Sequence, residues 1–131
     1  MLDGFTVLIT DRNRHVRNFL RRELMAEGCQ VEVAADGRDL MRKISKAPPV
    51  DLLILDLEIP HLGGAAVLRR IERAYPELPV IIHTFATEES THPAVQSAAA
   101  FVEKTGNVEL LKKVIEHVLT KLNPKSLTRR S

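Results

Sequence analysis

Residues 51–60 read DLLILDLEIP. The apolar run from Leu52 to Leu55 has the length of a strand, and its unbroken hydrophobicity is typical of a parallel strand buried on both faces. Asp56 stands where this run ends, and in open α/β sheets ligands and reacting groups gather at that end of the strands. From these residues alone, three roles stay open for the Asp56 carboxylate: a nucleophile, a metal ligand or a cap for the following loop.

The rest of the chain predicts four more strands, at Phe5–Thr10, at Val31 and Val33, at Pro79–Thr84 and at Ala99–Val102. Helical spacings separate them. The first predicted helix begins at a cap at Asn13 and ends at Gly28, and the second begins at a cap at Asp36 and stops at Pro48-Pro49. A third helix is predicted between Pro60 and Pro76, and a short fourth one at His92–Ala98. The last helix carries an apolar stripe from Leu111 to Leu122 and ends before Pro124. This alternation predicts an α/β fold, a doubly wound five-stranded parallel sheet with helices on both faces.

Four polar residues lie at or just past the carboxyl ends of predicted strands: Asp11, Asp56, Thr84 and Lys104. Right-handed crossovers bring the carboxyl ends of all parallel strands to one edge of the sheet. We therefore expect these side chains to converge, which indicates one site rather than four separate loop caps.

The four residue types suit the acceptance of a phosphoryl group. A carboxylate can attack phosphorus and form an acyl phosphate, provided that cations neutralise the charge on the transferred oxygens. Lys104 can be one fixed cation, and the Thr84 hydroxyl can donate to a phosphoryl oxygen. Asp11 can help to hold Mg²⁺, which prefers carboxylates, water and phosphate oxygens.

From Phe5 to about Leu122, the chain resembles a receiver domain of a two-component response regulator, a domain with the flavodoxin-like fold. The resemblance rests on four stretches in chain order, VLITD at 7–11, LILDLEIP at 53–60, VIIHT at 80–84 and FVEK at 101–104. Each is weak singly, but the four together, at the ends of the right strands, are specific.

The resemblance implies a role for each site residue. Asp56 is then the phosphoacceptor and Lys104 its cationic partner, while Thr84 and Phe101 form the switch pair that reorients on phosphorylation. The implied Mg²⁺ site consists of Asp11, Asp56 and the backbone carbonyl of Glu58.

The residue after Asp11 departs from the family. Receivers usually follow the first strand with two adjacent acids, the second of which binds the metal directly, but here the pair is Asp11-Arg12. A guanidinium cannot ligate Mg²⁺ and repels it, so we expect weakened Mg²⁺ binding. Two consequences stay open: Arg12 pairs with Asp56 and replaces the metal electrostatically, or Arg12 points to solvent and leaves a poorer site.

Further departures concern the switch. Phe85 follows Thr84 where the family favours a small residue, which narrows access to the acceptor. Thr105 follows Lys104 in place of the usual proline, and the stretch between Thr84 and Lys104 is shorter than usual. These changes alter the region of the fourth helix, a common signalling surface.

Composition excludes several other classes of protein. With 44% hydrophobic and 27% charged residues, the chain has the balance of a globular domain, and it contains no apolar run of membrane-spanning length. The lone Cys29, expected to be buried and inert, excludes a disulfide framework and suits a cytoplasmic setting. The net charge of +2 owes much to basic residues in the last seven positions, so we expect no direct nucleic-acid binding. His83 is expected to be a hydrogen-bonded core histidine.

We therefore expect a receiver domain at 1–124 followed by a tail or linker stub at 125–131. Its expected partner is a sensor histidine kinase or phosphotransfer protein, with a homodimer as a further option, and no enzymatic activity is expected. The alternative is a pseudo-receiver that binds partners independently of phosphorylation. A phosphohydrolase of the haloacid dehalogenase type is disfavoured because it needs a second aspartate where Glu58 stands, and because the chain has no room for its cap domain.

Overall fold

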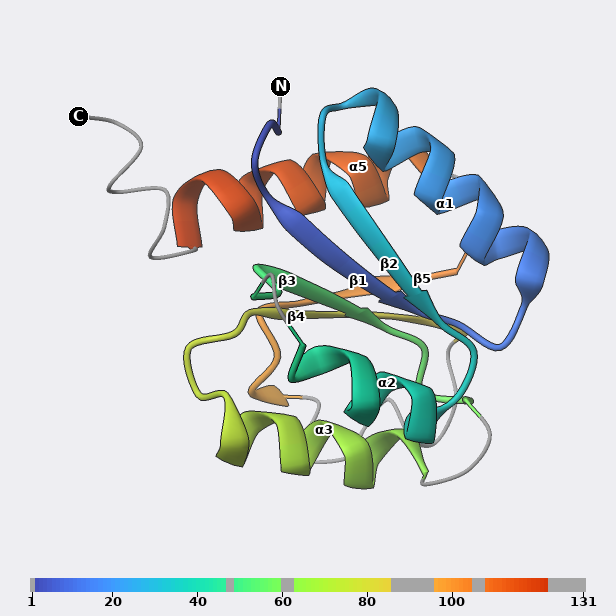
Figure 1. Ribbon diagram of the computed structural model, residues 1–131, viewed down its shortest axis with the longest axis vertical. Coiled ribbons are helices and arrows are strands. Elements are labelled where there is room, and N and C mark those ends of the chain that lie inside the picture. Colours follow the sequence, from blue (N-terminus) through green and yellow to red (C-terminus); the bar gives the residue numbers. More distant parts are fainter. Residues whose placement is uncertain (1, 47–48, 60–62, 86–95, 105–107, 123–131) are drawn as a thin grey trace.

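The computed structural model of the chain describes residues 2–46, 49–59, 63–85, 96–104 and 108–122. Its centre is a five-stranded sheet in the order β2-β1-β3-β4-β5, with every neighbouring pair parallel. Helices cover both faces of the sheet (Figure 1). The predicted doubly wound α/β fold is confirmed.

The strands are β1 (Thr6–Thr10), β2 (Gln30–Ala34), β3 (Leu52–Leu55), β4 (Val80–Thr84) and β5 (Ala100–Glu103). The helices are α1 (Arg14–Ala26), α2 (Gly37–Ile44), α3 (Gly64–Ala74) and α5 (Val108–His117), and α5 continues as a π-helical turn, η2 (Val118–Leu122). The helix predicted at His92–Ala98 lies mostly outside the described residues, and the tail at 125–131 lies wholly outside them.

Burial follows the apolar runs of the sequence. All residues of β1 and β3 are buried, whereas β2, at one edge of the sheet, alternates between exposed and half-buried positions before it ends at the buried Ala34. A strand with helices on both faces has no solvent side, so its sequence is continuously apolar. The continuous run at 52–55 therefore predicted a central strand correctly.

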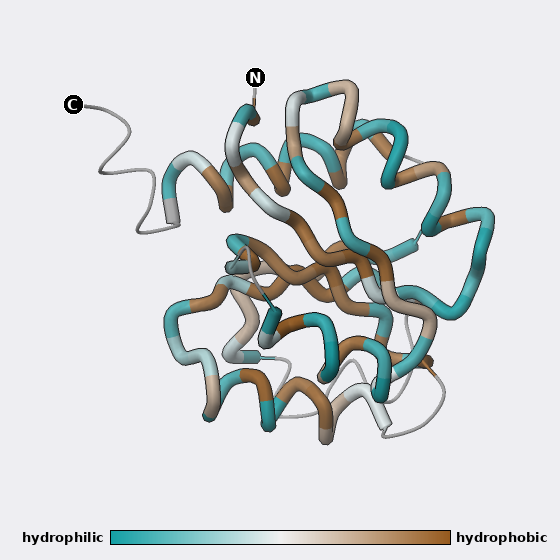
Figure 2. The backbone as a smooth tube through the Cα atoms, in the orientation of Figure 1, coloured by the Kyte–Doolittle hydropathy of each residue, from teal (hydrophilic) through white to brown (hydrophobic). Residues whose placement is uncertain are grey.

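Two hydrophobic clusters fill the spaces between the helices and the sheet. α1 and α5 contribute Leu20, Leu24, Leu111 and Ile115 to the cluster on one face. α2 and α3 contribute Leu40, Ile44, Val67, Leu68 and Ile71 to the cluster on the other. Figure 2 shows hydrophobic residues concentrated along the strands and on the helix surfaces that face them. Successive strand residues serve opposite clusters, so the sheet is sealed from water on both sides.

The helix caps predicted at Asn13 and Asp36 and the helix end predicted at Gly28 are confirmed. The Asn13 side chain accepts hydrogen bonds from the backbone N–H groups of His15 and Val16, at 2.8 and 3.3 Å. Asp36 likewise caps α2, accepting from a backbone N–H at 2.8 Å. Gly28 follows the end of α1 with a φ of +99°, a left-handed conformation that glycine adopts at little cost. These caps supply partners for backbone donors that helix termini leave unpaired.

The strand β3 is tied to β1 at both ends. At its start, Asp51 N–H donates to the Thr6 carbonyl at 2.8 Å, and the Asp51 carboxylate accepts from Thr6 N–H at 2.8 Å. At its far end, Asp56 N–H donates to the Thr10 carbonyl at 2.9 Å. These bonds fix how β3 lies along its neighbour.

The start of α3 packs closely against the loop that follows β3. A Cβ atom on Gly64 would lie 2.3 Å from the Leu57 carbonyl oxygen and 2.5 Å from its Cα, which is closer than real Cβ atoms come. Only glycine therefore allows this approach. The loop that carries Asp56 and Glu58 is held against the helix by backbone contact.

Candidate functional site

Three of the four residues predicted to converge are the first residues past their strands, and each extends the hydrogen bonding of the sheet. In each case the backbone N–H donates to the last carbonyl of the neighbouring strand: Asp11 to Ala34 at 3.1 Å, Asp56 to Thr10 at 2.9 Å and Lys104 to Thr84 at 2.8 Å. The sheet itself therefore brings these side chains to one edge, as the crossover rule predicted.

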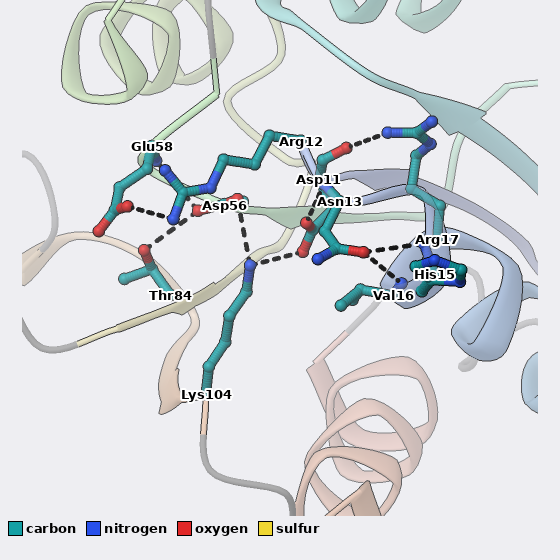
Figure 3. A network of polar contacts seen from close by, with 10 residues as sticks. All are labelled: Asp11, Arg12, Asn13, His15, Val16, Arg17, Asp56, Glu58, Thr84 and Lys104. Atoms are coloured by element: carbon teal, nitrogen blue, oxygen red, sulfur yellow. Dashed lines mark hydrogen bonds and ion pairs between the residues drawn. The ribbon is translucent and has the colours of Figure 1, made fainter.

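Lys104 joins two buried carboxylates. Its Nζ lies 2.8 Å from Asp11 Oδ2 and 3.1 Å from Asp56 Oδ2 (Figure 3). The side chains are almost fully enclosed, with 9% of Lys104, 2% of Asp11 and 1% of Asp56 exposed. Buried charges persist only when they are paired, so the ammonium and the two carboxylates depend on one another.

The second oxygen of Asp56 is also occupied. Asp56 Oδ1 accepts from the Thr84 hydroxyl at 3.1 Å and from Glu58 N–H at 3.0 Å. Thr84 is completely buried. We name Asp11, Asp56, Thr84 and Lys104 the floor of the site, since the first three are buried, Lys104 is largely enclosed, and all four are joined by hydrogen bonds or ion pairs.

Asp11 links the floor to the start of α1. Its Oδ1 accepts from Asn13 N–H at 2.8 Å, and its backbone carbonyl accepts from Arg17 Nη1 at 2.8 Å. Asn13 in turn caps α1 with its own side chain. The position of Asp11 is thereby coupled to the first turn of the helix.

Arg12 is paired with Glu58. Arg12 Nη2 lies 2.6 Å from Glu58 Oε2, and the two side chains are 45% and 25% exposed. In Figure 3, the Arg12 side chain extends from the end of β1 toward Glu58. Neither of the two options left open for Arg12 is found: it does not pair with Asp56, whose two oxygens have partners within the floor, and it does not point freely to solvent, because Glu58 holds it. We name Arg12 and Glu58 the rim of the site.

The two phenylalanines discussed for the switch are both exposed. Phe85, directly after Thr84, is 50% exposed, and its ring centroid lies 5.5 Å from Lys104 Nζ, within the range of a cation–π contact. Phe101 lies opposite Ile82 across the β4–β5 pair and is 40% exposed. The structure thus brings Thr84 to Asp56 and leaves Phe101 partly exposed to solvent.

His83 lies one residue before Thr84 in β4. Burial lowers the pKa of its imidazole, and the Lys104 charge lowers it further, against the weaker opposite effects of Asp11 and Asp56. Its buried Nδ1 has no hydrogen-bond partner among the described residues. The expectation of a hydrogen-bonded core histidine is therefore wrong for Nδ1, because this nitrogen is buried away from water and no described residue pairs with it.

Cys29 confirms its expected role as a buried apolar residue. It is 6% exposed and packs in the cluster beneath α1 and α5. Burial raises its thiol pKa to about 11, and the carboxylates of Glu27, Asp3 and Asp51 add to this effect. The thiol stays protonated near neutral pH and is a poor nucleophile.

The floor and rim combine carboxylates, which are ligands that Mg²⁺ uses, with a guanidinium, which cannot ligate it. Each oxygen of the Asp11 and Asp56 carboxylates already accepts a hydrogen bond or pairs with Lys104. Arg12, next to them, brings a positive charge where a cation needs a ligand. Within the described ranges, no group of three His, Cys, Asp or Glu side chains could hold a metal ion.

Comparison with known proteins identifies the family. The response regulator receiver domain family matches residues 7–116. The chain belongs to this family. It is 31% identical over 128 residues to a protein-glutamate methylesterase/protein-glutamine glutaminase of Trichodesmium erythraeum, covering 92% of this chain and 36% of that protein. It is 35% identical over 94 residues to the response regulator MprA of Mycolicibacterium vanbaalenii, covering 72% and 40%. The chain thus spans less than half the length of these relatives.

Solved receiver structures share the fold. The response regulator TrrA of Thermotoga maritima, in complex with Mg²⁺-BeF, matches with a TM-score of 0.81 and 26% identity, over 88% of this chain and 99% of that one. The receiver domain of NtrX from Brucella abortus matches with a TM-score of 0.78 and 28% identity, over 88% and 98%. The predicted flavodoxin-like receiver fold is confirmed.

Membership of this family indicates the general function of the chain. This chain is a receiver domain of two-component signalling, and such domains are in general not themselves enzymes. In the part of the chain that the structure describes, no helix has both the length and the apolar composition that crossing a membrane requires.

Proposed function

We propose that this receiver domain is a phosphoryl-operated switch in which Asp56 accepts a phosphoryl group from a histidine kinase or a phosphotransfer protein. The observation that carries the proposal is the floor of the site. It holds a buried carboxylate at the carboxyl end of a central strand, 3.1 Å from a largely enclosed ammonium and 3.1 Å from a buried hydroxyl. Nucleophile, cation and hydrogen-bond donor are the groups that phosphoryl acceptance requires.

Each floor residue has a role in the transfer. A carboxylate oxygen of Asp56 forms a bond to phosphorus while the phosphorus–nitrogen bond to the donor histidine breaks, and the nitrogen keeps the electron pair. Lys104 then pairs with a phosphoryl oxygen, and the Thr84 hydroxyl donates to another. Asp11 keeps Lys104 in place through their ion pair at 2.8 Å.

The switch would follow from this change of partners at Thr84. When its hydroxyl turns from Asp56 Oδ1 to the phosphoryl group, the end of β4 shifts, and the adjacent surface around Phe85 and Phe101 changes for a downstream partner. Both rings are already exposed at 50% and 40%, so they can contact a partner or turn inward. Mg²⁺ binding is proposed to be weak because Arg12 replaces a metal-binding acid.

The test is intact-mass spectrometry after incubation with acetyl phosphate, with and without Mg²⁺, on wild type and on Asp56→Asn. We expect a gain of one phosphoryl group in wild type and none in Asp56→Asn. Equal labelling of the two proteins would place the acceptor elsewhere, and no labelling of wild type under any condition would refute the proposal.

A pseudo-receiver that binds partners without phosphorylation is the second candidate. It is favoured by the Arg12–Glu58 ion pair, in which the two rim side chains satisfy each other's charge without a phosphoryl group or a metal ion. On this alternative, Asp56→Asn binds the downstream partner as tightly as wild type does. On the switch proposal, phosphorylation changes that affinity and Asp56→Asn does not respond to the phosphodonor.

A further inference from the structure

With Arg12 in place of an acid, the charge of the site is more positive by two units, which is the change that binding of a divalent metal ion would produce. In receivers with two acids after the first strand, the pair carries two negative charges, which a bound divalent cation cancels. Here Asp11 and Arg12 cancel each other without any ion. One residue therefore supplies the charge that a bound metal ion would bring.

The guanidinium of Arg12 is held close to the acceptor. Glu58, its partner at 2.6 Å, is two residues past Asp56, and the Glu58 N–H donates to Asp56 Oδ1 at 3.0 Å. The carboxylate that holds Arg12 and the amide that binds the acceptor thus belong to the same residue. Figure 3 shows Arg12, Glu58 and Asp56 in one group at the end of β3.

The Arg12–Glu58 pair is suited to exchange. Both side chains reach solvent, at 45% and 25% exposure, and ion pairs at such positions are weak and screened by salt. A phosphoryl group carries nearly two negative charges and three acceptor oxygens, so it competes well with one carboxylate for a planar guanidinium. Lys104 has less freedom, because its side chain is 9% exposed and stays paired with Asp11 when it contacts the phosphoryl group.

We propose that phosphorylation of Asp56 draws the Arg12 guanidinium from Glu58 to the phosphoryl oxygens, so that Arg12 does the work of a divalent cation and acyl phosphate forms without metal. This inference rests on the proposed function, since it requires Asp56 to be phosphorylated. Glu58 is the counter-ion of the resting state and is released on phosphorylation. The released carboxylate, on the loop after β3, becomes a second signal beside the Thr84 shift.

With acetyl phosphate as donor, the step balances without an ion. An Asp56 carboxylate oxygen forms a bond to phosphorus as the phosphorus–oxygen bond to the acetyl group breaks, and acetate leaves with the electron pair. The transferred PO₃⁻ unit brings one negative charge to Asp56, which already carries one, and the other negative charge of acetyl phosphate leaves on acetate, so no proton, oxidant or reductant is needed. The negative charge gathered at Asp56 meets Lys104 on one side and Arg12 on the other.

The experiment measures the initial rate of phosphorylation by acetyl phosphate, followed by intact mass, in excess EDTA and in excess Mg²⁺. In wild type we expect rates that differ by less than about threefold between the two conditions, since the metal adds little to a site already neutralised. In EDTA, Arg12→Gln lowers the rate by about tenfold or more, the scale of a lost charge-assisted hydrogen bond. Arg12→Lys keeps the charge and recovers most of that loss.

Two further variants test the exchange. Glu58→Gln removes the competing carboxylate and raises the rate in EDTA by up to about fivefold, the strength of an exposed ion pair. Arg12→Asp restores the two acids, gains Mg²⁺ binding in a calorimetric titration and is phosphorylated only with Mg²⁺. Arg22→Ala, which removes a positive charge from an exposed position of α1, is the matched control and changes neither rate.

The outcomes separate the two proposals. If wild type is never labelled, the proposed function fails. If wild type is labelled on Asp56 only with Mg²⁺, and Arg12→Gln is labelled as fast as wild type, the function stands and the inference about Arg12 is overturned. Absence of any gain in Mg²⁺ affinity in Arg12→Asp also contradicts it.

Discussion

Lys104 and Arg12 are two cations at one edge of the same sheet, and the structure holds them in opposite ways. Lys104 lies in the floor, is 9% exposed and bridges two buried carboxylates. Arg12 lies in the rim, is 45% exposed and contacts one carboxylate that is itself partly in water. In the floor, each charge depends on its partners for stability. In the rim, water can replace either partner.

The difference teaches which contacts can serve a reversible signal. A buried ion pair is costly to break because it leaves an uncompensated charge away from water. An exposed pair contributes little to stability, so its rearrangement is cheap. Fixed positioning of the acceptor thus comes from the floor, and adjustment to a new anion comes from the rim.

The sharpest test of the comparison is Lys104→Met, which keeps the length of the side chain and removes the charge. Asp11 and Asp56 then lose their shared counter-ion, and we expect the free energy of unfolding at pH 7 to fall by about 3–5 kcal/mol. Urea denaturation followed by circular dichroism measures it. Lys113→Met on the exposed face of α5 is the control, with a change within about 0.5 kcal/mol. Equal effects of the two variants would mean that the floor is not held by charge.

Thr84→Val tests the hydroxyl of the floor. The valine side chain is close in shape but cannot donate to Asp56 Oδ1, so we expect a loss of about 1 kcal/mol in the same denaturation measurement. Thr120→Val removes an exposed hydroxyl that donates to the Glu116 carbonyl, and its change should be clearly smaller. A neutral Thr84→Val would show that the 3.1 Å contact adds nothing to the folded state.

His83→Gln tests the influence of the floor charges through pH. Because the pKa of His83 is lowered in the folded protein, the unfolded chain binds more protons as the pH falls below about 6.5. The stability contribution of neutral His83 is therefore fully present above that pH and is lost as the pH falls through the folded-state pKa.

The measurement is the free energy of unfolding between about pH 7.5 and pH 5. We expect His83→Gln to lose less stability than wild type over this range. The same substitution at an exposed histidine, His15→Gln, is the control for the loss of an imidazole as such. Parallel curves for wild type and His83→Gln would contradict the prediction.

Arg12→Ala gives the smallest expected effect. Loss of the rim pair should change the free energy of unfolding by no more than about 0.5–1 kcal/mol, and addition of salt should shrink the difference between the variant and wild type. Chemical denaturation at low and high NaCl measures both. A loss as large as that of Lys104→Met would erase the distinction between floor and rim.

Much of the fold was predictable from local patterns. The continuous run at 52–55 marked a central strand because only a strand covered on both faces can be apolar throughout. Asn13, Asp36 and Gly28 marked helix ends because their backbone and side-chain chemistry favours those positions. The convergence of the four floor residues followed from the topology, since the carboxyl ends of parallel strands lie at the same edge of the sheet.

The partners of individual side chains were less predictable. For Arg12, a pair with Asp56 and a side chain in solvent both stayed open, and the pair with Glu58 was not among these options, because the order of residues along a loop does not say which of two nearby carboxylates a long, exposed side chain reaches. That Lys104 would bridge Asp11 as well as Asp56 was also not foreseen, although two acids and one lysine at a buried edge are a signal for it. The unpartnered nitrogen of His83 depends on what packs opposite the strand, which the strand sequence does not contain.

The paired bonds between Asp51 and Thr6 have a consequence for how the acceptor could be lost. Between these bonds and the one at Asp56 lie only the residues of β3, so the length of the strand fixes the distance from Asp51 to Asp56. If one residue were inserted within 52–55, Leu55 would occupy the position of the Asp56 carboxylate relative to the bonds at Asp51. If one residue were deleted there, Leu57 would occupy it. Point substitutions that keep the strand apolar leave the spacing intact. The position of the Asp56 carboxylate therefore depends less on the identity of the four residues of β3 than on their number.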